Sequence, residues 1–93
     1  MGELLAEAEL LIRNQLGLHA RAAALLVKTA ARFRSQVFVS RDDLEVNAKS
    51  ILGVMMLAAE TGSTIKVRAE GEDADEAIAA LKALVEGRFG GEP

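Results

Sequence analysis

The stretch from Asn14 to Phe33 constrains the fold of this chain more than any other, because it predicts an amphipathic helix that follows a glycine-containing loop. Its apolar residues recur at the spacing of one buried helical face: Ala23, Leu26, Val27 and Ala30. Its basic residues fall on the opposite side: Arg21, Lys28 and Arg32. We therefore expect this helix to cover a core with one face and to present positive charge to solvent with the other.

The single histidine of the chain, His19, stands two residues after Gly17 and directly before this helix. The first N–H groups of a helix have no partner inside it and carry the positive end of its dipole, so that phosphate often binds there. An imidazole at this point, with the guanidinium of Arg21 two residues further on, can hold or accept a phosphoryl group. The alternative is that His19 only caps the helix and that Arg21 is a solvated surface charge. The residues alone leave both interpretations open.

Size and composition exclude several classes of protein. The 93 residues leave room for one domain with one core, but not for a large pocket between two domains. Without cysteine and with one histidine, the chain has no disulfide framework, no thiol nucleophile and no pattern for a zinc or other metal site. We expect no cofactor. The net charge of −3 argues against nucleic-acid binding, which needs a basic surface.

The amino-terminal stretch from Met1 to Ile12 lacks the basic start, apolar centre and cleavage site of a signal peptide. Ala6 stands where the myristoylation pattern requires serine or threonine. No apolar run approaches the roughly 20 residues of a membrane span. We therefore expect a soluble, cytoplasmic protein that does not insert into a membrane.

Alternation of apolar and polar residues predicts the strands. Glu7 to Arg13 is a half-buried strand, and the ranges 36–40 and 44–46 form a hairpin whose turn lacks glycine. Thr64 to Glu70 is the clearest alternating strand of the chain. The sequence therefore predicts four strands.

Two more helices are expected. Ser50 is an N-cap for a helix of about two turns. Asp73, with Glu76 three residues later, predicts a capping box for a longer helix that Gly87 ends. The apolar stripe of that helix comprises Ala74, Ala77, Ile78, Leu81, Leu84 and Val85.

The resulting order is strand, helix, strand, strand, helix, strand, helix. An α+β fold satisfies this order, with a four-stranded, largely antiparallel sheet covered by helices on one face and solvated on the other. We expect a single domain with its core at about residues 7–87 and a flexible tail at residues 88–93. Many unrelated activities use such an architecture, so the fold cannot decide the function.

Two motifs resemble the HPr family, the histidine phosphocarriers of the bacterial phosphoenolpyruvate-dependent sugar phosphotransferase system. The first runs from Gly17 to Arg21 and continues with Ala23 and the apolar residues 25–27, and the second runs from Asn47 to Met55. The resemblance covers about residues 7–87. It implies an open-faced sandwich with three helices on one face of the sheet and the strand order 1-4-2-3.

The resemblance also implies roles for individual residues. His19 matches the histidine that takes a phosphoryl group on Nδ1 from Enzyme I and passes it to the Enzyme II A components, and Arg21 matches the arginine that steadies the phosphate. Ser50 matches the serine that HPr kinase/phosphorylase modifies in many relatives. The positions that resemble the family's docking surface for partner proteins are Ala20, Ala24, Lys28, Ile51, Leu52 and Met55. Such a protein is a monomeric carrier rather than an enzyme.

One position departs from the family pattern, since Ala22 stands where a proline usually follows the arginine. Proline in the first helical turn fixes φ and gives up an N–H that has no partner inside the helix, whereas alanine favours the helix but leaves its start less rigid. Two alternatives also remain. Met55 and Met56 fit a core as well as a docking surface, and the fold class also suits a small regulatory binding module without covalent chemistry. Within the family, a nitrogen-regulatory or dihydroxyacetone-phosphorylating branch is a further alternative.

Overall fold

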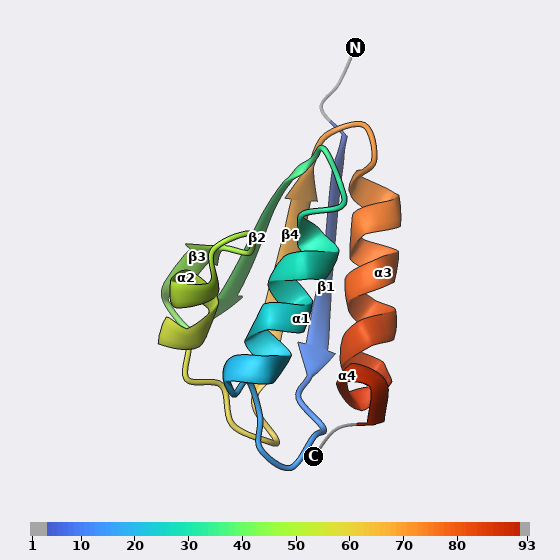
Figure 1. Cartoon of the computed structure of the whole chain (residues 1–93). Coiled ribbons are helices and arrows are strands. Elements are labelled where there is room, and N and C mark those ends of the chain that lie inside the picture. The colour runs from blue at the N-terminus through green and yellow to red at the C-terminus, as the bar shows by residue number, and fades with distance from the viewer. Residues whose placement is uncertain (1–3, 92–93) are drawn as a thin grey trace.

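A computed structural model describes residues 4–91 and shows a four-stranded sheet with helices on one face (Figure 1). The elements, in chain order, are β1 Leu5–Leu11, α1 Ala20–Ala30, β2 Gln36–Arg41, β3 Leu44–Asn47, α2 Ile51–Met56, β4 Thr64–Glu70, α3 Ala74–Glu86 and α4 Arg88–Gly91. No helix in the described part of the chain is long and apolar enough to cross a membrane.

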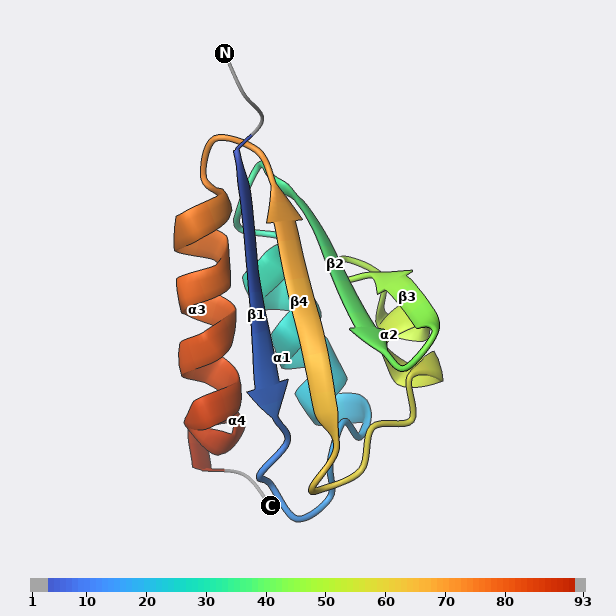
Figure 2. The same ribbon diagram turned by 180° about the vertical axis from the view of Figure 1, so that it is seen from behind.

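The strands lie in the order β1-β4-β2-β3, and every neighbouring pair is antiparallel. Val67 of β4 is opposite Ala8 on one side and Val39 on the other, so that one face of the sheet collects the small aliphatic residues. Seen from behind, the other face carries no helix (Figure 2). The expected α+β fold and the strand order 1-4-2-3 are confirmed.

The core lies between the inner face of the sheet and the helices α1 and α3 (Figure 1). On α1, the buried residues are Ala22, Ala23, Leu26 and Ala30, while Val27 is partly buried. On α3, the expected stripe is buried except for Leu84, which is partly buried. These side chains meet Val37, Val39, Ile65 and Val67 from the sheet. The helical periodicity therefore identified the packing faces correctly.

The first strand begins and ends two residues earlier than the alternation predicts. Leu11 pairs with Thr64, where β4 begins, so Ile12 has no partner strand beside it. Ile12 is nevertheless buried, and its N–H donates a 2.8 Å hydrogen bond to the carbonyl oxygen of Ser63 in the neighbouring loop. In the hairpin turn without glycine, Asp42 takes the left-handed conformation at φ 54°, which aspartate tolerates better than most residues.

The expected flexible tail is wrong for residues 88–91. Phe89 is 1% exposed and belongs to the hydrophobic core, because α4 turns the chain back after α3. This turn uses left-handed backbone at every residue from Arg88 to Gly91, and the N–H groups of Gly90 and Gly91 donate to the carbonyl oxygen of Gly87. Residues 92–93 lie outside the described part of the chain.

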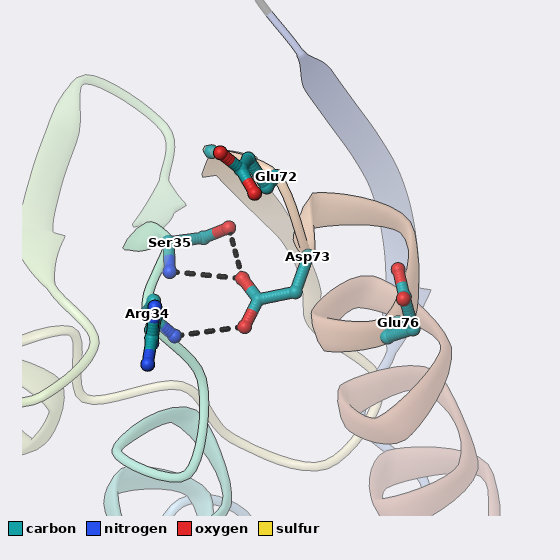
Figure 3. A pocket seen from close by; sticks show the side chains of 6 residues that line it. Arg34, Ser35, Glu72, Asp73 and Glu76 are labelled. Carbon is teal, nitrogen blue, oxygen red and sulfur yellow. Dashed lines mark hydrogen bonds between the residues drawn. The ribbon is translucent and has the colours of Figure 1, made fainter.

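The expected capping box is also wrong. Asp73 is the N-cap residue of α3, but its side chain makes no cap hydrogen bond. Its carboxylate instead accepts hydrogen bonds from the N–H groups of Arg34 and Ser35, at 2.8 and 2.9 Å, and from the Ser35 hydroxyl (Figure 3). Glu76 remains exposed. The hydrogen bond from the Ser35 hydroxyl, followed by that from Arg34, lowers the pKa of Asp73 below its ordinary value of 3.8.

Candidate functional site

His19 is the N-cap residue of α1, with extended backbone at φ −70° and ψ 175°. Its carbonyl oxygen accepts the 2.8 Å hydrogen bond from the N–H of Ala23 that starts the helix. Its side chain makes no cap hydrogen bond. The interpretation of His19 as a simple capping residue is therefore wrong, and the imidazole is available for another role at the positive end of an 11-residue helix.

The loop before His19 is fixed by a local side chain and by a distant loop. Buried Asn14 donates from Nδ2 to the carbonyl oxygen of Gly17 at 2.7 Å, and Gly17 N–H donates back to the Asn14 carbonyl oxygen at 3.1 Å. Gly17 has φ +65°, and a Cβ at this residue would collide with the carbonyl oxygen of Ala59. Glycine is therefore needed here both for its conformation and for the close approach of the two loops.

One nitrogen of the His19 ring is enclosed by the protein. Nε2 is buried and has no hydrogen-bond partner within the described residues. Beside the ring lies a hollow of about 470 Å³, whose lining residues are Gln15, Leu16, Leu18, His19, Ala58, Ala59, Glu60 and Thr61. The loop before α1 and the loop after α2 run side by side at this end of the molecule (Figures 1 and 2).

The remaining site residues expected on α1 share its outer surface. Ala20, Ala24 and Lys28 follow one another at intervals of four residues and are all exposed, so they form one row along the helix. Arg21 is exposed as well and lies two residues after His19. Ala22, at the position of the family's proline, is buried. The helix α1 begins at Ala20 although alanine stands here in place of that proline.

The short helix α2 begins as expected. Ser50 is its N-cap, and the Ser50 Oγ accepts a 3.1 Å hydrogen bond from the N–H of Gly53. The exposed apolar residues of α2 are Ile51, Leu52, Met55 and Met56, and Leu52 has an exposed fraction of 77%. The alternative that Met55 and Met56 fill the core is therefore wrong. The helix α2 contacts α1, which carries the exposed row of Ala20, Ala24 and Lys28.

Sequence reasoning missed three features of this site. Leu16 is 62% exposed and lines the hollow beside His19, but a lone leucine in a loop gives no pattern. The loop of Ala58 to Thr61 also lines the hollow, and only the turn at Gly62 marked it in the sequence. Met56, exposed beside Met55, could not be separated from core residues by periodicity in so short a helix. Among the described residues, no group of three or more His, Cys, Asp or Glu side chains could hold a metal ion.

The comparisons with known proteins agree with this geometry. Residues 6–87 match the family model described as "PTS HPr component phosphorylation site". The chain is 54% identical over 83 residues to a phosphocarrier protein HPr of Xylella fastidiosa. This alignment covers 89% of this chain and 93% of the relative.

Two solved structures from Thermoanaerobacter tengcongensis are also similar. One is a crystal structure of HPr-C-His, with a TM-score of 0.90 and 50% identity over 95% of this chain and 99% of the other. The second is a crystal structure of an HPr dimer, with a TM-score of 0.74 and 52% identity over 84% of this chain and 90% of the other. The chain therefore belongs to the HPr family, and it is a phosphocarrier of the phosphotransferase system rather than an enzyme with a turnover of its own.

Proposed function

We propose that His19 accepts a phosphoryl group on Nδ1 from phospho-Enzyme I and passes it to the Enzyme II A components that serve sugar uptake. The observation that carries this proposal is the position of His19 at the N-cap of α1, with a side chain that makes no cap hydrogen bond. The burial of Nε2 supports Nδ1 as the nucleophile.

The proposed transfer needs little from this protein beyond position and charge. The lone pair of Nδ1 forms a bond to phosphorus while the bond between phosphorus and the donor breaks, and that electron pair returns to the donor. The proton of the neutral ring then resides on Nε2. The positive end of α1 and the guanidinium of Arg21 stabilise the charge of the attached phosphate, so that the carrier stays phosphorylated until the next acceptor docks.

We assign partner binding to the docking surface, which comprises Ala20, Ala24, Lys28, Ile51, Leu52 and Met55. Its apolar part on α2 is exposed, and α2 contacts α1, the helix that carries the other part and directly follows His19. Small alanine side chains leave room for a partner to approach the helix closely. The basic charges of Arg21, Lys28 and Arg32 complement an acidic partner surface and speed its approach.

Ser50 is a regulatory site under this proposal and a substrate of HPr kinase/phosphorylase. It starts the helix that carries Ile51 and Leu52, so a phosphate there adds about −1.5 to −2 charges beside an apolar surface that must lose water when a partner docks. The helix N-terminus accepts that charge without unfolding. Phosphorylation of Ser50 would thus weaken docking and leave the fold intact.

We further propose that the chain works as a cytoplasmic monomer made of one HPr-like domain. Light scattering at micromolar concentration tests this proposal directly against the dimer seen for a relative. A mass of one chain supports it, and a mass of two chains contradicts it.

The proposed function is tested by incubating the purified protein with Enzyme I and phosphoenolpyruvate and by measuring its intact mass. We expect a gain of one phosphate that depends on Enzyme I, followed by its loss when an Enzyme II A component is added. A mass that stays unchanged would favour a regulatory binding module over a carrier. A gain that persists in the presence of several Enzyme II A components would contradict the proposed sugar branch.

A further inference from the structure

Arg41, the last residue of β2, reaches from the hairpin to the end of α2. Its Nη1 donates hydrogen bonds to the carbonyl oxygens of Leu57 and Ala58, at 3.2 and 2.8 Å. The last carbonyls of a helix have no partner inside it, and a guanidinium satisfies them with charge-assisted hydrogen bonds. A side chain from the sheet therefore holds the point where α2 ends.

The helix α2 needs such an attachment because its own residues contribute little to its stability. It has six residues, of which Val54 alone is buried, and its remaining large side chains are exposed. Isolated helices shorter than about 12 residues are marginal in water, so the position of α2 depends on contacts outside the helix. Lys49 supplies a second attachment at the other end, where its Nζ donates a 2.8 Å hydrogen bond to the carbonyl oxygen of Phe33.

The residues that follow α2 connect Arg41 to the loop that precedes His19. Ala58 has a left-handed backbone at φ 50°, which is strained for an alanine and therefore needs support. Its carbonyl oxygen is the one that Arg41 binds at 2.8 Å. The next residue, Ala59, accepts a 2.9 Å hydrogen bond from the N–H of Leu18, which directly precedes His19.

We infer that Arg41 is a positioning residue for phosphoryl transfer, which holds α2 and the following loop in the arrangement on which the partner docks. It acts through Leu57, Ala58 and the apolar residues of α2. This inference rests on the proposed use of α2 in docking. Its effect should fall on partner affinity, because α1 and His19 are anchored separately by the buried residues Ala22, Ala23 and Leu26.

The test compares Arg41→Met with a matched control, Arg34→Met. Methionine keeps much of the aliphatic stem and removes both donors and the charge. Arg34 lies just before the start of β2, whereas Arg41 is at its end, and the backbone N–H of Arg34, not its side chain, binds Asp73 (Figure 3). Below the melting temperature of all variants, we expect Arg41→Met to raise KM for phosphorylation by Enzyme I at least about fivefold, with kcat within about twofold. In the control, Arg34→Met, KM and kcat should both stay within about twofold of the values of the unmodified protein.

Hydrogen exchange provides a second measurement that needs no partner. In Arg41→Met, we expect the amides of Leu18 and Ala58 to exchange at least about fivefold faster, while those of β4 keep their rates. Unchanged exchange at both amides, a KM within twofold of the unmodified protein, or a loss confined to kcat would each overturn the inference. If the unmodified protein takes no phosphate from Enzyme I, the proposed function fails, and the exchange rates still decide whether Arg41 holds the loop.

Discussion

The N–H of Leu18 donates a 2.9 Å hydrogen bond to the carbonyl oxygen of Ala59, and this contact joins the loop before α1 to the loop after α2. His19 follows Leu18 directly, whereas Ala59 comes three residues after the last residue of α2, the helix that bears the exposed side chains of Ile51, Leu52, Met55 and Met56. The proposed phosphoryl acceptor and the surface that we assign to its partners are therefore linked by a main-chain hydrogen bond.

Gly17 is the first position where this can be tested. Gly17→Ala should destabilise the protein by about 3 kcal/mol, because alanine is strained at φ +65° and its Cβ would collide with the Ala59 carbonyl oxygen. Gly62→Ala is the matched control, since Gly62 has φ +88° but no atom within 4 Å of the added Cβ, and it should cost only about 1 kcal/mol. Urea unfolding measures both changes, and equal losses would show that the loops do not need their close approach.

Ser50 combines a cap with a proposed switch. Ser50→Ala should cost about 1 kcal/mol, because the N–H of Gly53 loses its acceptor. Ser50→Asp and Ser50→Asn should both keep the cap, so their melting temperatures should stay close to that of the unmodified protein. Only the aspartate adds charge to the apolar surface of α2, so only this variant should show a raised KM for Enzyme I. Equal KM values for the two variants at the same ionic strength would show that the serine is merely a cap.

Arg21 should matter to the phosphorylated state more than to the fold. Arg21→Ala removes a guanidinium two residues from His19, and we expect transfer from Enzyme I to slow at least about tenfold with little change in melting temperature. Arg32→Ala removes the same charge just beyond the last residue of α1 and should slow transfer less than about threefold. Similar rates for the two variants, measured by rapid quench, would mean that Arg21 contributes only to the overall positive charge.

Asp73 provides a prediction for pH. Its pKa is lowered below 3.8 by the hydrogen bonds from Ser35 and Arg34, so its carboxylate stabilises the folded state at neutral pH. This contribution to stability is complete above the pKa that Asp73 has in the unfolded chain. It is lost as pH falls through the lower pKa that Asp73 has in the folded protein. Asp73→Asn should therefore lower the melting temperature at pH 7, and the difference should shrink below about pH 4. A difference that is constant from pH 7 to pH 2 contradicts the account.

The sequence allowed the prediction of the fold and of the helix that follows the proposed acceptor, His19. Periodicity identified the buried faces of α1 and α3, and alternation identified β4 with its correct bounds. These features depend on neighbours in the chain or on burial of one face, which a single sequence records. The capping role of Ser50 is likewise local, since its hydroxyl binds an N–H three residues away.

The features that sequence reasoning missed depend on contacts between distant segments. The Asp73 carboxylate binds residues 38 and 39 positions away, so a local capping pattern pointed to the wrong partner. Phe89 follows a helix-ending glycine and looked like part of a tail, but left-handed backbone returns it to the core. Arg41 gave no signal at all, because its partners at Leu57 and Ala58 are main-chain carbonyls. Every residue has a main-chain carbonyl, so the residue types in a sequence do not indicate which carbonyls accept a hydrogen bond from a side chain.

His19 itself is the subject of the most direct measurement. The unmodified protein and His19→Ala are incubated with Enzyme I and labelled phosphoenolpyruvate, at equal concentrations and after circular dichroism has shown that both are folded. We predict that the unmodified protein takes one phosphate, which is lost in acid and retained in base as expected for a phosphorus–nitrogen bond, and that His19→Ala takes none. Undiminished labelling of His19→Ala, or a label on the unmodified protein that survives acid, would contradict the assignment of His19 as the phosphoryl acceptor.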